Sequence, residues 1–379
     1  MERKLPPVKA NNSRSDITTN VNLIFQEFLR DNPLKQSLGP AFSLMQKDEA
    51  WDNLILHRMH KKFAHVTEEG ALDRRILTIN NMLKYDANGV QSFRNKLYRG
   101  DSVDPWIRRQ LFQSRDKLRE IITNYRFGVN GLNFPSGETY CSAGGDVSLY
   151  AKLRDRSQWC CTPECFDLFA NLCYTSPILK YAARRHFKQW QIAHKKKFDD
   201  KNMWSAATGS HYKKAFAIFK AKLRVIVTFV VGARIGTVSK DLIVDRVIEC
   251  DAFCNMCVQL TIDSEIKRLI SDYYGIDLEH SQVLHQMMLS DVNNATIDFN
   301  NASNSTWLSV VEWYFEGTRF WSHLQQARCG FVELPGSYDS VSESFDVHIE
   351  CCDISTREIM NVEPDGLYSL NMLSPMGNG

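Results

Sequence analysis

Asp298 ends a short apolar stretch, Ala295-Thr296-Ile297, and is followed by small polar residues as far as Ser305. The β-branched residues before it favour a buried strand, and the Asn, Ala and Ser residues after it favour a turn. A carboxylate at the end of a strand can hold a divalent metal against a phosphate-bearing substrate. An isolated Asp is more often a helix N-cap, so Asp298 alone does not decide between these roles. We predict that the turn leads into a helix over Trp307–Phe315.

Basic residues suited to a nucleoside triphosphate lie upstream of Asp298. Arg234, Lys240 and Arg246 accompany the stretch Leu223–Val238, whose β-branched residues predict a strand. Arg and Lys side chains on such a strand neutralise a triphosphate without occupying metal ligands. The residue types of Arg234, Lys240 and Arg246 are therefore suited to binding a triphosphate.

Aromatic and basic side chains alternate in residues 137–200. The aromatic residues are Trp159, Phe166, Phe169, Tyr174, Tyr181 and Trp190. Such a mixture can stack bases and follow an RNA backbone, although each residue taken singly fits better as part of an ordinary amphipathic helix. Taken together, the many Lys and Arg residues of 184–224 predict a basic surface. We assign RNA contacts to Lys188, Lys195, Lys196 and Lys197, and we expect His186 and His194 to be surface residues.

Cys250, Cys254 and Cys257 have the spacing with which radical S-adenosylmethionine enzymes hold a four-iron cluster. The same spacing places all three on one face of a helix, where free Cys behaves as a small hydrophobic residue. The repeated strand-helix alternation of a barrel is missing from the sequence. We favour a buried helical stripe continuing through Val258, Thr261, Glu265 and Arg268, and keep the iron-sulfur enzyme as a remote alternative.

Several segments, taken in order, resemble one protein family. They are Gly137-Glu138, Lys152-Leu153, Trp159-Cys160-Cys161-Thr162, Leu179-Lys180-Tyr181-Ala182-Ala183, Arg246, Asn255-Met256-x-x-Gln259, Gly275-Ile276-Asp277-Leu278, Ala295-Thr296-Ile297-Asp298 and Met376-Gly377-Asn378-Gly379. This order is similar to the RNA-directed RNA polymerase (replicase beta subunit) of single-stranded RNA bacteriophages, the levivirus family. The capsidless narnaviruses are a neighbouring possibility. Nothing before about Tyr125 resembles the family as specifically.

The resemblance implies an α+β right-hand polymerase with fingers and a partial palm. It makes Asp298 the catalytic ligand of the first of two Mg²⁺ ions. It also assigns triphosphate binding to Lys240 and Arg246, with Arg234 as a weaker candidate. Asn378 and Gly377 correspond to a Gly-rich loop that contacts template and ribose. Asn304 stands where the family has a second Asp, which puts sugar selection in doubt. Asp251-Ala252 replaces the family's Glu-Pro and loses a rigid turn.

The family's Gly-Asp-Asp hairpin, which carries the remaining metal ligands, has no convincing counterpart here. Gly144-Gly145-Asp146 comes too early, and Phe198-Asp199-Asp200 lies in a lysine run typical of a solvated surface. The thumb is missing as well. We expect a truncated polymerase or half of a split one, with little or no catalysis by this polypeptide alone. The resemblance also implies three host partners, which are elongation factors Tu and Ts and an RNA-binding ribosomal protein. It places the protein in the cytoplasm of a bacterial host.

Composition fits a globular, non-membrane protein. The 379 residues are 44% hydrophobic and carry a formal net charge of +2, so RNA binding must come from local basic patches. Eleven cysteines without a secretory signal fit free thiols in a reducing compartment. We predict a leader and helical region over 1–125, fingers over 126–290 and a partial palm over 291–379. A non-catalytic RNA-binding protein remains the alternative.

Overall fold

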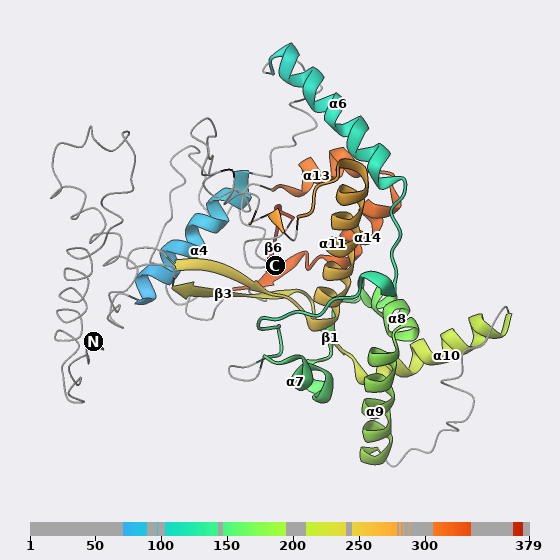
Figure 1. Ribbon diagram of the computed structural model, residues 1–379. Helices are drawn as coiled ribbons and strands as arrows, with labels where there is room; N and C mark the ends of the chain where they lie inside the picture. Colours follow the sequence, from blue (N-terminus) through green and yellow to red (C-terminus); the bar gives the residue numbers. More distant parts are fainter. Residues whose placement is uncertain are drawn as a thin grey trace, which may run out of the picture. The chain divides into compact units, whose positions relative to one another are not determined.

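The computed structural model (Figure 1) is a mixed α+β protein in which helices predominate over short strands. It describes residues 71–88, 103–142, 147–194, 210–239, 245–278, 306–334 and 367–373, and the single positions 97, 280, 281, 283 and 288. The α+β class is therefore confirmed. The right-hand polymerase arrangement and the three domain boundaries stay predictions.

The chain divides into two compact units. One consists of Met1–Asn80 with Thr237–Arg246, and the other of Asn81–Gly236 with Val247–Gly379. Helix α4 (Ala71–Asn88) buries Ile76, Ile79 and Met82. Apolar residues at three-residue spacing are typical of one buried face of a helix, and α4 lies within the helical region predicted over 1–125. The predicted leader and the earlier part of the helical region lie outside the described residues.

Local sequence sets the ends of the main helices in the second unit. Helix α6 (Pro105–Ile122) begins after Asp104, whose carboxylate accepts the Trp106 N–H at 2.7 Å. Helix α9 (Pro177–Ala193) begins after Ser176, whose hydroxyl oxygen accepts from an N–H of the first turn. Proline at the first position suits both starts, because its missing N–H has no helical partner there. Helix α11 (Phe253–Tyr274) ends at Gly275, whose φ of +67° favours glycine.

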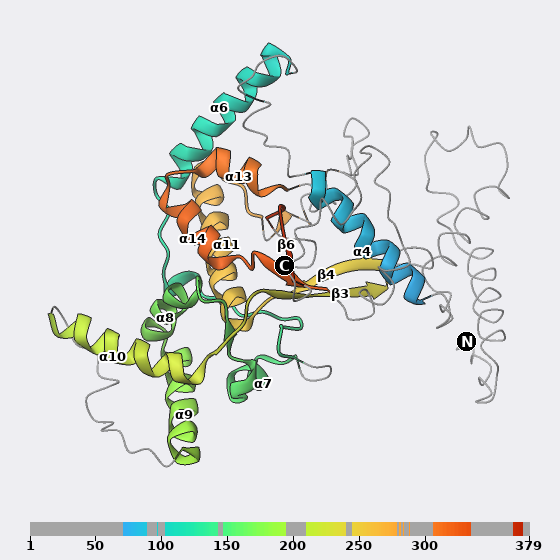
Figure 2. The same cartoon turned by 180° about the vertical axis from the view of Figure 1, so that it is seen from behind.

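The core of the second unit surrounds α11. This helix contacts α6, α8 (Phe166–Thr175) and α14 (Arg319–Ala327), and α8 in turn packs on α9 and α10 (Ser210–Ile226). Figure 2 shows α8 between α11 and the α9–α10 pair. Trp159 lies at the centre, with its ring 5.7 Å from that of Phe169 and 6.1 Å from that of Phe253. Full burial of each such side chain stabilises the fold by about 1.5–3 kcal/mol.

The described strands form two small sheets. Strand β1 (Cys160–Cys161) pairs in parallel with β2 (Thr228–Phe229). The second sheet has the order β4 (Asp245–Cys250), β3 (Ala233–Ser239), β5 (Phe331–Glu333) and β6 (Leu367–Ser369). Strand β5 is parallel to β3 and antiparallel to β6. A Cβ on Gly232 would lie 1.9 Å from the Phe331 carbonyl oxygen, so only glycine permits this approach.

The remaining described elements are short. They are α7 (Leu149–Arg154), the 3₁₀ turns η3 (Val129–Gly131) and η4 (Arg156–Gln158), and α13 (Leu308–Phe315). Helix α13 begins after Trp307, so the helix predicted over Trp307–Phe315 is confirmed to within one residue. Its Trp313 is fully buried.

The strand predicted over Leu223–Val238 is wrong in its first part. Helix α10 continues to Ile226, and β3 begins only at Ala233. Leu223 and Ile226 are buried on one helical face, and packing there outweighs the preference of β-branched residues for strands. The β-rich pattern is therefore correct only beyond the helix.

The predicted stripe is buried only from Cys254 to Thr261, because Glu265 is partly exposed and Arg268 is exposed further along α11. Cys254 and Cys257 are fully buried in α11 together with Val258 and Thr261. Cys250 does not belong to that helix, because it ends β4. Free thiols thus serve as small core residues at the start of α11.

Candidate functional site

The residues assigned to the predicted site divide into two groups. Arg234, Arg246 and Lys188 are described by the structure. The others lie outside the described residues, and they are Asp298, Lys240, Asn304, Gly377, Asn378, Lys195, Lys196 and Lys197. The catalytic part of the assignment therefore stays a prediction, and the described geometry bears mainly on RNA binding.

Helices α9 and α10 form a strongly basic pair. Helix α9 carries four Lys or Arg residues, α10 carries five, and neither contains an Asp or Glu. The exposed members are Arg184, Arg185, Lys188, Lys213, Lys214 and Arg224. The two helices pack against each other, so this charge is concentrated in one part of the second unit (Figure 2). The basic surface predicted over 184–224 is consistent with this arrangement.

Three further lysines of the pair contact other side chains of the second unit. Lys222 is buried, with Nζ 4.8 Å from the centre of the Phe187 ring. Lys180 lies with Nζ 4.2 Å from the Tyr174 ring, and partial burial lowers its pKa. Lys220 forms an ion pair with Asp167 of α8. These contacts attach the pair to the rest of the second unit.

The aromatic residues of this region separate into core and surface. Trp159, Phe166, Phe169 and Tyr174 are buried, so their use in base stacking is excluded. Tyr181 is 71% exposed on α9, and Trp190 is partly exposed.

The expectation that His186 lies at the surface is also wrong. It is fully buried, with Nε2 2.9 Å from the Leu153 carbonyl oxygen and its ring packed against Trp159.

Two segments that carry the family resemblance meet at Asn255. The Asn255 side chain is fully buried and accepts the Thr162 N–H at 3.0 Å. Its amide donates to the Thr162 hydroxyl at 2.9 Å and to the Ala327 carbonyl at 3.0 Å. Gln259, one turn further along α11, donates to the same Ala327 carbonyl and to the Asp251 carboxylate. The Asn-Met-x-x-Gln segment thus joins α11 to the β1–α8 turn and to the end of α14.

A second resemblance segment surrounds Lys152. This lysine is fully buried, and its ammonium donates to the Pro135 carbonyl at 2.8 Å and to the Gly137 carbonyl. The Trp159 indole N–H donates to the Lys152 carbonyl at 3.1 Å. Burial lowers the Lys152 pKa, and the two carbonyls partly compensate for lost water. Lys152 therefore fixes the course of the preceding loop.

No family model matches this chain. No curated protein matches it significantly either. The likeness to levivirus replicases therefore rests on the short segments that carry it. Among the described residues, no group of three or more His, Cys, Asp or Glu side chains is placed to hold a metal ion. Within the same residues, no helix is long and apolar enough to cross a bilayer.

Arg234 lies on β3 next to Glu333 of β5, with which it is in register. Its guanidinium is 3.9 Å from the Glu138 carboxylate and 3.4 Å from the Ser142 carbonyl. Tyr140 donates to Glu333 at 3.0 Å, and burial followed by this hydrogen bond raises the pKa of Tyr140 to about 12. The Arg234–Glu138 contact is long and solvent-accessible, so a phosphate can compete for the guanidinium.

Arg246 is exposed on β4, between the buried Asp245 and Val247. This alternation directs its side chain to the outer face of the strand. Arg246 belongs to the first unit and Arg234 to the second.

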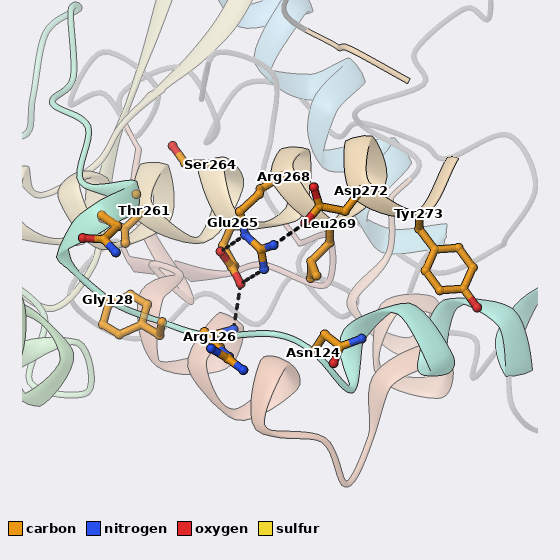
Figure 3. Close-up of a pocket in the computed structure, with 13 residues that line it drawn as sticks. Asn124, Arg126, Gly128, Thr261, Ser264, Glu265, Arg268, Leu269, Asp272 and Tyr273 are labelled. Atoms are coloured by element: carbon orange, nitrogen blue, oxygen red, sulfur yellow. Dashed lines mark hydrogen bonds and ion pairs between the residues drawn. The ribbon is translucent and has the colours of Figure 1, made fainter. Parts of the chain in front are cut away.

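A pocket of about 790 Å³ lies between α11 and the segment 124–131 (Figure 3). The Arg268 side chain lines this pocket, and its guanidinium donates hydrogen bonds to the Glu265 carboxylate at 2.7 Å and to the Asp272 carboxylate. The Arg126 N–H also donates to Glu265 at 2.9 Å, and the Arg126 side chain lines the pocket. Two arginines and two carboxylates leave the pocket without net positive charge. It therefore matches a polyanion less well than the basic helices do.

A buried carboxylate holds the segment after β6, and no sequence signal indicated it. Asp86 of α4 is fully buried and accepts the Tyr368 hydroxyl at 2.6 Å, the Met372 N–H at 2.6 Å and two donors of Asn371. Arg328 donates to the Leu370 carbonyl at 2.9 Å and to that of Met372 at 3.1 Å. These contacts fix the chain that leads to the predicted Gly-rich loop.

Proposed function

We propose that this chain is the RNA-binding part of a template-directed RNA polymerase, comprising fingers and part of a palm. The observation that carries the proposal is the charge of α9 and α10, which concentrate four and five basic residues without an acid. The whole chain has a formal net charge of only +2, so this charge is local. A concentrated positive surface attracts the phosphate backbone and makes binding depend on salt.

The polymerase part of the proposal is supported by the segments that resemble levivirus replicases and meet at Asn255. In this proposal Arg234, Lys240 and Arg246 bind the triphosphate, Asn304 and Asn378 contact the ribose, and Gly377 contacts the template. Asp298 would hold Mg²⁺, which supplies charge neutralisation when the 3′-hydroxyl displaces pyrophosphate. Asp298 lies outside the described residues.

The proposal also includes the binding partners and the location that the resemblance implies. They are the RNA template and product, ribonucleoside triphosphates, elongation factors Tu and Ts and a ribosomal protein, in the cytoplasm of a bacterial host.

A non-catalytic RNA-binding protein is the second candidate. The same basic helices favour it, since such a protein needs their charge and needs neither Arg234 nor Asp298. The two candidates differ in one property, which is binding of a nucleoside triphosphate that depends on magnesium.

Binding of a fluorescent ribonucleoside triphosphate, with and without Mg²⁺, separates the two. A polymerase is expected to bind it in a Mg²⁺-dependent manner. Asp298→Asn should then remove the dependence on Mg²⁺, and Arg234→Gln should weaken binding. Arg109→Gln on the exposed face of α6 is the control for loss of one positive charge. Retained RNA binding without any triphosphate binding would overturn the polymerase proposal and leave the RNA-binding protein.

A further inference from the structure

One face of α9 remains exposed along the whole helix. Ile178, Tyr181, Arg185, Lys188 and Ile192 follow one another at alternating three- and four-residue spacing, so they form one stripe. All five are exposed, with 52% of Ile178, 71% of Tyr181 and 71% of Ile192 accessible. We call this set the α9 stripe.

The opposite face of the same helix is fully committed to the core. It buries Leu179, Ala182, Ala183, His186 and Phe187. The α9 stripe therefore cannot turn inward without unpacking that core. Its large exposed apolar side chains are a surface feature of the folded chain.

The charge around Tyr181 identifies the class of partner. Arg184 and Arg185 lie one turn further along α9, and both are exposed. Lys188 lies one turn beyond, about 10 Å from Tyr181 at about 1.5 Å per residue. With no acid on α9 or α10, this surface complements a polyanion and repels basic proteins.

The exposed Tyr181 ring indicates which form of polyanion this surface binds. A tyrosine ring offers a face on which an unpaired base can stack, whereas bases inside a duplex are already stacked on each other. We propose that the α9 stripe binds single-stranded RNA, with one base on the Tyr181 ring and phosphates on Arg185 and Lys188. This inference rests on the proposed RNA-binding function and adds the form of RNA and the stacking residue.

The test uses a fluorescein-labelled, unstructured single-stranded RNA and the duplex of the same sequence, titrated with the full chain. Tyr181→Ala should weaken single-strand binding by about 5- to 150-fold, since stacking on one aromatic ring contributes about 1–3 kcal/mol. Tyr181→Phe keeps the ring and should stay within about twofold of the unmodified chain. Duplex binding should not change in either variant.

Tyr150→Ala is the matched control, because Tyr150 is 65% exposed on α7 and lies outside the α9 stripe. It should leave single-strand binding unchanged. The salt dependence supplies a second readout. Tyr181→Ala should keep the slope of log K against log salt, whereas Arg185→Gln with Lys188→Gln should reduce it by about 0.7 per lost phosphate contact.

The outcomes separate this inference from the proposed function. If Tyr181→Ala binds single strands as well as the unmodified chain, or weakens single strand and duplex equally, stacking on Tyr181 is refuted while RNA binding stands. If the unmodified chain binds neither form of RNA, the proposed function itself fails.

Discussion

Replacing Asn255 with leucine substitutes an apolar side chain of similar size for a buried amide. That amide hydrogen-bonds to three groups. In the structure Asn255 accepts the Thr162 N–H and donates to the Thr162 hydroxyl and the Ala327 carbonyl. Leucine can do neither, and the site is closed to water because Asn255 is fully buried. The substitution thus leaves polar groups in the core without their partners.

The expected loss follows from those groups. An unsatisfied Thr162 N–H costs about 1–3 kcal/mol, and loss of the hydroxyl contact costs about 0.5–1.5 kcal/mol. The Ala327 carbonyl keeps the Gln259 amide at 3.1 Å, so it adds little. We therefore expect Asn255→Leu to lower the free energy of unfolding by about 2–4 kcal/mol.

Urea unfolding followed by circular dichroism and tryptophan fluorescence measures this loss, because Trp159 is fully buried in the same core. Met256→Leu is the matched control, since Met256 is only partly buried and such a swap usually costs less than about 1.5 kcal/mol. A loss below about 0.5 kcal/mol for Asn255→Leu, typical of a surface position, would refute this account of the segment.

Two further predictions concern buried ionisable groups. Asp86→Ala should cost about 3–5 kcal/mol, because it removes the acceptor of four donor groups, and amide hydrogen exchange should show loss of protection over residues 367–373. Asp116→Ala on the exposed side of α6 should do neither. Burial lowers the pKa of His186 below the ordinary 6.5, so below that pH the unfolded chain binds the proton more readily. The urea midpoint should therefore fall as the pH drops from 7.5 through about 6.5, and less so in His186→Gln; a midpoint that rises would contradict the neutral, buried ring.

The parts of the fold that were predictable from sequence are those in which a helical period agrees with burial. Ile76, Ile79 and Met82 on α4 and the helix after Trp307 are examples. Leu223–Ile226 was not predictable, because β-branched residues there join α10 through packing against α8 and α9. Local preference and tertiary contact disagree at that point, and tertiary contact determines the structure.

The candidate site was predictable only as a region. The run of basic residues identified α9 and α10, but it gave no means of separating the exposed Tyr181 from the buried Tyr174. His186 and Asp86 were missed for the same reason. A lone polar residue is placed in the core by partners distant in sequence, here Leu153 and Asn371.

The basic pair also explains why net charge was uninformative. A chain with a formal net charge of +2 is not attracted to RNA as a whole. Its charges are nonetheless unevenly distributed, since α9 and α10 contain no acid while α11 pairs Arg268 with Glu265 and Lys267 with Asp263. The exposed charge of α9 and α10 therefore gives a net positive surface, whereas much of the charge on α11 is balanced by ion pairs within that helix.

The most direct test of the central claim compares two double variants in single-stranded RNA binding over a salt series. Arg185→Gln with Lys188→Gln removes charge from α9, and Arg109→Gln with Lys117→Gln removes equal charge from exposed positions of α6. If α9 and α10 form the RNA surface, the α9 variant alone should weaken binding and lower the salt slope by about 1.4 for two lost phosphate contacts. Equal loss in both variants, or none in either, would contradict the claim.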